Sequence, residues 1–184
     1  GGLCGDAIDT ASNNTAVGRS ALSADCGDSN VAVGYLAGNA TTGNQNTLVG
    51  SLAGDAITTG NSNVSVGHGS LGANTQSHRN TAIGEFSLAA LNITTSTNAY
   101  NTALGYSAGT AITTGLYNTL IGGLAGDALT TGSTNVALGV QALTTEDTGQ
   151  GAVAIGYQAL YSQNYDGVSY NVAVGRNAGE AVTT

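Results

Sequence analysis

The chain has 184 residues, only 8% of them charged, and a formal net charge of −8 at pH 7, whereas about 25% of residues are charged in an ordinary domain. Its basic residues are Arg19, Arg79 and Arg176, too few and too scattered for binding to nucleic acid or an anionic membrane. No apolar stretch approaches the roughly 18 residues of a membrane helix, so we expect no membrane span in this segment. Since the sequence starts and stops inside a repeat, we expect it to be part of a longer chain.

A short phrase that ends on glycine recurs along the whole chain. In chain order these glycines are Gly18, Gly34, Gly50, Gly67, Gly84, Gly105, Gly122, Gly139, Gly156 and Gly175. Most spacings are 16 or 17 residues, but Gly105 follows Gly84 by 21 and Gly175 follows Gly156 by 19. An asparagine lies four residues before nearly every one of them, as at Asn46, Asn63, Asn80, Asn101, Asn118 and Asn135, and Ala152 breaks the series.

Each phrase has the alternation of a short strand. Thr or Val stands three residues before the glycine, usually Ala two before, and always an aliphatic residue one before, as at Val49, Val66, Ile83, Leu104, Ile121 and Leu138. Period-2 alternation predicts a strand with one face buried. We expect the aliphatic position to face the core and the Ala position to face a close neighbour. Thr-Thr-Gly at 41–43, 58–60, 113–115 and 130–132 predicts a second strand and its turn.

The repeat predicts an all-β fold, a parallel β-solenoid of about ten coils of 16–17 residues, spanning residues 1–184 as one segment. Stacked asparagines would hydrogen-bond along the rod, and stacked aliphatic residues would form a thin core. Four residues after each glycine only Gly or Leu occurs, in an order that groups the coils into units of four, about 30–100 and 101–170. Because so thin a core leaves little surplus over chain entropy, we expect neighbouring chains to complete the burial.

The phrases "NVAVGYLAGNATTGNQ" and "NTALGYSAGTAITTGLY" resemble the head repeats of YadA-like trimeric autotransporter adhesins. Similar arrays occur in phage tail fibres. The resemblance covers nearly the whole chain, although the coils here are longer than the adhesin repeat. It implies a left-handed β-roll, a homotrimer, and a location outside the cell, on the cell surface or on a virion.

No pattern in the sequence indicates catalysis. Gly105–Gly109 reads Gly-x-Ser-x-Gly, but sister coils carry leucine at the site of Ser107, and no helix follows it. His68 and His78, and the equivalent acids Asp55 and Asp127, are possible metal ligands, but surface and turn-capping roles fit them better. We therefore expect no enzyme, no catalytic residue, no metal and no cofactor.

Two kinds of side chain are candidates for binding. Tyrosines gather in and near the two long spacers, where rings among polar residues suit recognition of a glycan or another surface; the alternative is that they cover the core edge or a chain interface. The candidates are Tyr100, Tyr106, Tyr161, Tyr165 and Tyr170. The recurring Thr-Thr pairs raise the alternative of an ice-binding solenoid.

The two cysteines, Cys4 and Cys26, could form a disulfide, remain free or link neighbouring chains. Together these features predict a structural or adhesive fibre segment that associates with itself as a homotrimer and presents loops to a cell-surface glycan or matrix. Alternatives are a self-polymerising filament that stacks end to end, and an ice-binding solenoid.

Overall fold

A computed structural model of the chain describes residues 5–6 and 10–183. Its regular elements are all strands, and no described helix could cross a membrane. The strands are β1 (Thr15–Val17), β2 (Val31–Val33), β3 (Thr47–Val49), β4 (Val64–Val66), β5 (Ser77–His78), β6 (Thr81–Ile83), β7 (Thr97–Asn98), β8 (Thr102–Leu104), β9 (Thr119–Ile121), β10 (Val136–Leu138), β11 (Val153–Ile155) and β12 (Val172–Val174).

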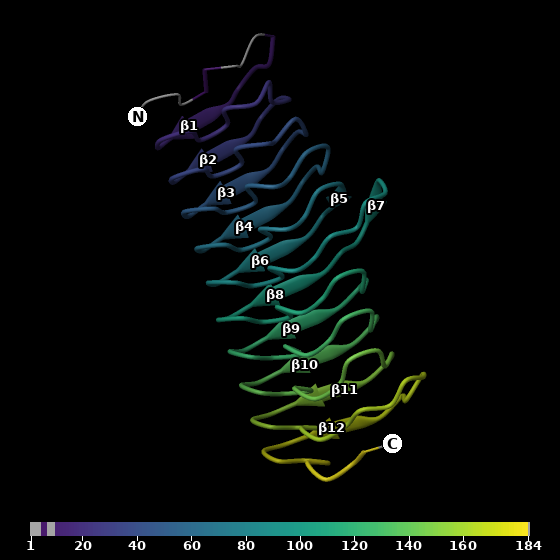
Figure 1. Cartoon of the computed structure of the whole chain (residues 1–184). Coiled ribbons are helices and arrows are strands. Elements are labelled where there is room, and N and C mark those ends of the chain that lie inside the picture. Colours follow the sequence, from purple (N-terminus) through teal and green to yellow (C-terminus); the bar gives the residue numbers. More distant parts are fainter. Residues whose placement is uncertain (1–4, 7–9, 184) are drawn as a thin grey trace.

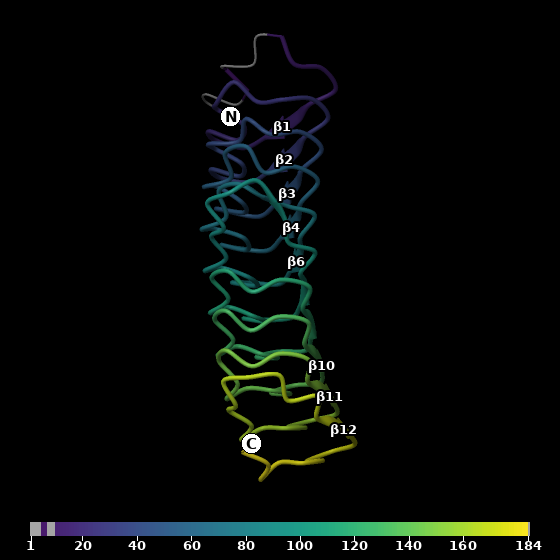
Figure 2. The ribbon, with the colours of Figure 1, turned by 90° about the vertical axis from the view of Figure 1, so that its right-hand side faces the viewer.

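Ten of these strands form one parallel sheet in chain order, and β5 and β7 form a separate pair. The strands stack one above the next along a rod (Figure 1), on one side of it, and the rest of each coil returns along the other side (Figure 2). Equivalent residues pair in register, so Val49 lies beside Val66 and Ile83 beside Leu104. The prediction of a parallel β-solenoid is confirmed.

The prediction of a second strand at each Thr-Thr-Gly is wrong. These segments form bends, and each coil contributes a single three-residue strand to the large sheet. The bends still bond to the next coil: the N–H of Thr42 donates to the carbonyl of Thr58, and the N–H of Thr113 to that of Thr130. Gly43 and Gly115 follow within these bends, where the chain turns too soon for a strand to extend.

The asparagines four residues before each glycine form a ladder inside the rod. Nδ2 of Asn63 donates to Oδ1 of Asn46 at 3.2 Å, and Nδ2 of Asn118 donates to Oδ1 of Asn101 at 3.2 Å. Most of these Nδ2 groups also donate to the carbonyl three residues before the next ladder position, as Asn118 does to Gly132 at 2.8 Å. The ladder therefore joins successive coils to one another and to the turn that precedes each strand.

The expected orientation of the strands is wrong. The middle residue of the strand is the buried one, as at Leu120 with 0% exposure, whereas Leu104 is 46% and Val17 is 56% exposed. The reason lies in the ladder: Asn118 and Leu120 are two residues apart, so they share a face of the strand. Because the asparagine side chain faces inward, where it bonds to the asparagines and turn carbonyls of neighbouring coils, the aliphatic residue before the glycine must face outward.

The alternation of Gly and Leu four residues after each strand-ending glycine reflects packing across the core. A Cβ at Gly38 would lie 2.6 Å from Cδ1 of Leu48, and one at Gly54 would lie 2.8 Å from Cδ2 of the same leucine. The same arrangement recurs around Leu120. In the coil of Ala82, whose strand carries no leucine, Leu88 is fully buried instead. Complementary volumes thus produce the four-coil period.

The strand-ending glycines occupy a backbone region closed to other residues. Gly84 has φ +128, and a Cβ there would lie 2.4 Å from the carbonyl oxygen of Gly105 in the next coil. Gly105, with φ +142, meets Gly122 in the same way. Both conformation and close approach demand glycine, which is why the phrase always ends on it.

Candidate interaction surfaces

The outward side of the large sheet is an apolar surface, which we call the aliphatic face. It consists of the residues one and three positions before each strand-ending glycine. These are Thr15, Val17, Val31, Val33, Thr47, Val49, Val64, Val66, Thr81, Ile83, Thr102, Leu104, Thr119, Ile121, Val136, Leu138, Val153, Ile155, Val172 and Val174. All are Val, Ile, Leu or Thr, and none is charged. A contiguous uncharged surface of this kind is a candidate interaction site.

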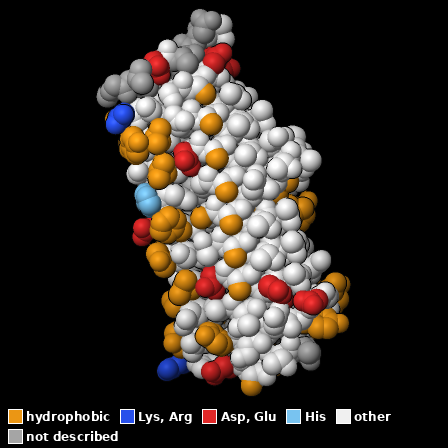
Figure 3. Space-filling model, in the orientation of Figure 1, with side chains coloured by type: hydrophobic (Ala, Val, Ile, Leu, Met, Phe, Trp, Pro, Cys, Tyr) orange, Lys and Arg blue, Asp and Glu red, His pale blue; other side chains and the backbone are white. Residues whose placement is uncertain are grey.

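An aromatic row follows one edge of the aliphatic face, at the residues just after the strand-ending glycines. Tyr35, Tyr106 and Tyr157 are exposed there, and the guanidinium of Arg19 lies 5.8 Å from the ring centroid of Tyr35. Figure 3 shows hydrophobic side chains gathered down one edge of the rod. The same positions in other coils carry Arg19, His68, Glu85 and Arg176, so this edge mixes aromatic and charged side chains.

The structure does not bring the five candidate tyrosines into one site. Tyr100 and Tyr106 are both exposed, but Tyr100 lies before β8 and Tyr106 after it, at opposite ends of that strand. Tyr165 and Tyr170 are exposed in the second long coil, and Tyr161 is half-buried there. The ring of Tyr170 lies against Gly151 in the coil before it. Tyr100 lies beside a hollow in the surface, which its partner Arg79 lines.

Three exposed side chains form a stack beside that hollow. The rings of Tyr100 and Tyr117 are 6.0 Å apart at an interplanar angle of 17°. Nη1 of Arg79 donates to the Tyr100 hydroxyl at 3.3 Å, and the guanidinium carbon lies 5.6 Å from the ring centroid. Each residue stands just before the ladder asparagine of its own coil, so the solenoid itself places them one above the other.

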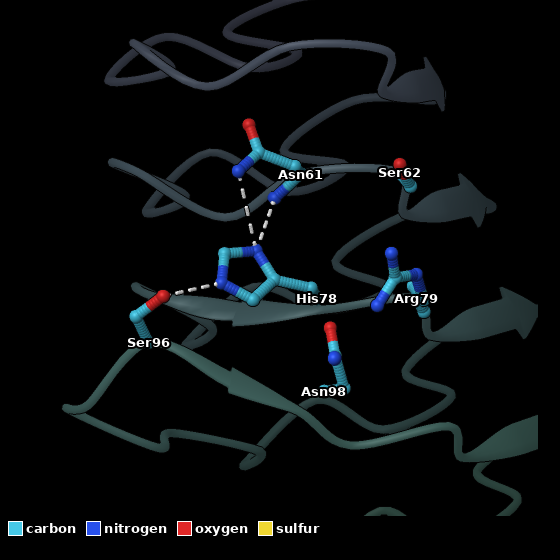
Figure 4. Close-up of a pocket in the computed structure, with 6 residues that line it drawn as sticks. All are labelled: Asn61, Ser62, His78, Arg79, Ser96 and Asn98. Atoms are coloured by element: carbon cyan, nitrogen blue, oxygen red, sulfur yellow. Dashed lines mark hydrogen bonds between the residues drawn. The ribbon is translucent and has the colours of Figure 1, made fainter.

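The hollow, which we call the polar hollow, has a volume of about 310 Å³ and opens to solvent. It lies where the first long coil carries β7 alongside β5, because the additional residues between Gly84 and Gly105 project from the rod. Its polar groups surround the space between an imidazole and a guanidinium (Figure 4). The residues that line it are Asn61, Ser62, His78, Arg79, Ser96 and Asn98.

His78 is held as a neutral ring in this hollow. Burial first, and then the nearby charge of Arg79, lower the pKa of its imidazole below the ordinary value. The backbone N–H of Asn61 donates to Nδ1 at 2.8 Å, so the neutral ring carries its proton on Nε2. Nε2 lies 2.8 Å from Oγ of Ser96 and therefore donates to it. In this tautomer the imidazole cannot take a proton from Ser96, which argues against a nucleophilic pair.

The sequence allowed His68 and His78 to be either a pair of metal ligands or, as the better fit, two surface histidines. The structure gives the two rings different partners: His68 lies 3.7 Å from a carboxylate oxygen of Glu85 and packs edge-on against Phe86. Arg79, Ser96 and Asn98 were not singled out. The available signal was the length of the first long coil, which predicts a projecting segment but not its partner.

The equivalent acids Asp55 and Asp127 are partly buried in their coils. Burial raises the pKa of Asp55 and, in the equivalent coil position, that of Asp127. The described part of the chain contains no group of three His, Cys, Asp or Glu residues placed to hold a metal ion. The carboxyl groups of Asp55 and Asp127 are therefore side chains of the coil that are partly removed from water.

One threonine of each Thr-Thr-Gly segment uses its hydroxyl group within the solenoid. Oγ1 of Thr42 donates to the carbonyl of Thr58 at 3.1 Å, and Oγ1 of Thr130 donates to that of Asp147 at 3.0 Å. Donors already paired along the rod are less available to organise water. Of the two cysteines, Cys26 is buried, and Cys4, with which it was considered for a disulfide, lies outside the described residues.

Comparison with known proteins adds no relative: no family model, no curated protein and no solved structure matches this chain. The fold by itself defines the class, a parallel β-solenoid repeat protein. Its function must therefore be argued from its own surfaces.

Proposed function

We propose that this chain is a structural segment of an extracellular fibre, on a cell or virion surface, that associates with copies of itself and displays its long coils to a glycan or matrix. The observation that carries the proposal is the aliphatic face. Leu104, Leu138 and Val174 are 46%, 42% and 67% exposed on a single chain. Covering such side chains contributes roughly 25 cal/mol for each Å² of apolar surface removed from water.

A second copy of the same chain fits this face better than an unrelated partner does. The rows repeat at about 4.8 Å, the spacing of adjacent strands, so parallel copies would match coil for coil along the rod. The face has no charge, although the chain carries −8 overall, so copies would not repel one another there. Three flat faces meeting around an axis give a trimer, which is the state that the resemblance to trimeric adhesins implies.

The test is the mass of the chain by light scattering across a dilution series, for the wild type and for the double variant Leu104→Glu with Ile121→Glu. We expect a fixed mass of three chains for the wild type and of one chain for the variant, with an unchanged circular dichroism spectrum. The matched control is Thr114→Glu with Thr131→Glu, at two exposed positions outside the sheet, which should leave the trimer intact.

Other masses would support the alternatives. A mass that grows with concentration would favour a filament stacked end to end over a closed trimer. A monomer at all concentrations would refute self-association through the aliphatic face, and thermal hysteresis from that monomer would favour ice binding.

A further inference from the structure

We propose that the polar hollow is a binding site for an acidic sugar, whose carboxylate would pair with Arg79 and whose hydroxyl groups would pair with the surrounding amides and hydroxyls. The proposal rests on the display role proposed above and names the ligand of the first long coil. It does not depend on self-association. Four observations support it: charge, prepared geometry, polar complementarity and an internal comparison.

The charge of the hollow opposes that of the chain. Arg79 is the only residue with a permanent charge among those that line it, and no carboxylate lines it, whereas the chain carries −8. His78 contributes no charge near neutral pH, because burial and Arg79 lower the pKa of its ring. The hollow is thus a local positive site on an acidic protein, which favours an anion.

The guanidinium of Arg79 is held in place before any ligand arrives. It donates to the Tyr100 hydroxyl at 3.3 Å and lies 5.6 Å from the ring centroid. Tyr100 is itself stacked on Tyr117. A guanidinium has five N–H donors in a fixed fork, so the donors not directed at Tyr100 can form a bidentate pair with a carboxylate. Fixing the side chain in advance reduces the entropy lost on binding.

The remaining groups suit a polyhydroxyl compound. The amides of Asn61 and Asn98 and the hydroxyls of Ser62 and Ser96 can each donate and accept, which is what sugar hydroxyl groups also do. Figure 4 shows the Asn98 amide between His78 and Arg79, where it faces the same space as both. The volume of about 310 Å³ is at the lower limit of ligand pockets and suits one sugar ring.

The second long coil shows that the fold does not require Arg79. Counted from the strand-ending glycine, the residue equivalent to Arg79 is Gly151, and that equivalent to Tyr100 is Tyr170. There the tyrosine ring packs directly on the glycine, 3.1 Å from the place of a Cβ. The tyrosine is retained and the arginine is not, so a coil of this kind can be built without Arg79.

The same comparison extends to the projecting strands. His78 lies beside Asn98 in the pairing of β5 with β7, and the corresponding parallel bridge in the second long coil joins Gln150 to Val168. Parallel pairing thus persists without the imidazole of His78 and the amide of Asn98. The positions equivalent to Asn61, Ser62 and Ser96 remain polar in the second long coil, but the imidazole and the guanidinium occur only beside the first.

The experiment follows amide chemical shifts of the intact chain as D-glucuronate is added, with D-glucose and acetate as reference compounds. The variants are Arg79→Gly and Asn98→Val, which install the residues of the second long coil. The matched control is Arg19→Gly, since Arg19 is an exposed arginine beside Tyr35 at a comparable 5.8 Å. Circular dichroism establishes whether each variant is folded. If Arg79→Gly does not fold, Asn98→Val tests the site independently.

We expect saturable shifts at residues of the hollow with D-glucuronate, and at least tenfold weaker binding of D-glucose and of acetate. Arg79→Gly should weaken D-glucuronate binding at least tenfold, as for loss of a hydrogen bond to a charged group, and Arg19→Gly should not change it. The proposal is overturned by absent or non-saturable shifts, by equal binding of acetate, or by equal effects of Arg79→Gly and Arg19→Gly. Light scattering on the same samples shows whether the chain is a trimer, so the result for D-glucuronate binding is judged separately from self-association.

Discussion

The asparagine ladder makes a quantitative prediction about Asn118, which is fully buried. Its Nδ2 donates to the carbonyl of Gly132 at 2.8 Å, and its Oδ1 accepts from the backbone N–H of Asn135 at 3.0 Å. Asn118→Ala would leave both backbone groups without these partners in the core. Each such group costs about 1–3 kcal/mol, so we expect a loss of about 2–6 kcal/mol in the free energy of unfolding.

The matched control is Asn44→Ala, the same chemical change in an exposed asparagine. Oδ1 of Asn44 accepts from the N–H of Asp28 at 2.7 Å, but water can replace it there, so we expect a loss below about 1 kcal/mol. Urea unfolding gives the free energies, and hydrogen exchange at the Asn135 amide gives a local readout that holds even if the rod unfolds in parts. Equal costs for the two variants, or undiminished protection of the Asn135 amide in Asn118→Ala, would refute the reasoning.

Three further changes test other parts of the structure by thermal and urea unfolding. Gly105→Ala should cost at least about 2 kcal/mol, because φ is +142 and the Cβ would lie 2.5 Å from the carbonyl oxygen of Gly122; an unchanged melting temperature would contradict this. Glu146 is fully buried and accepts from two backbone N–H groups and one side-chain amide. Glu146→Ala should therefore lower the free energy of unfolding by about 3–5 kcal/mol. A loss below about 1 kcal/mol would show that water replaces the carboxylate. Burial raises the pKa of Asp127 above 3.8, so ionisation of its carboxyl group destabilises the folded state as pH rises through the pKa of the folded chain. Asp127→Asn should therefore stabilise the chain at pH 7, with a gain in stability that disappears below pH 3.8. A gain independent of pH would exclude the ionisation of Asp127 as the cause.

The first long coil shows how far the sequence could lead toward the binding surfaces. Its excess length predicted a projecting segment, and Tyr100 was predicted to lie on a surface for binding. Arg79 and Asn98 could not be assigned, because they come from different coils and meet only when β5 and β7 pair. Because the two residues are distant in the sequence, no local pattern in either segment indicates that it contacts the other.

By itself the sequence determined the solenoid, its parallel register and its period, because the glycine and asparagine positions each satisfy a local demand of the backbone. Glycine is needed where a Cβ would meet the next coil, as at Gly84, and asparagine where an amide must reach the turn carbonyl of the next coil, as at Asn118. Only the tertiary structure decided which face of the strand is buried. Hydrophobicity favoured the position of Leu104, but the direction of the asparagine ladder placed Leu120 inside and left the aliphatic face exposed.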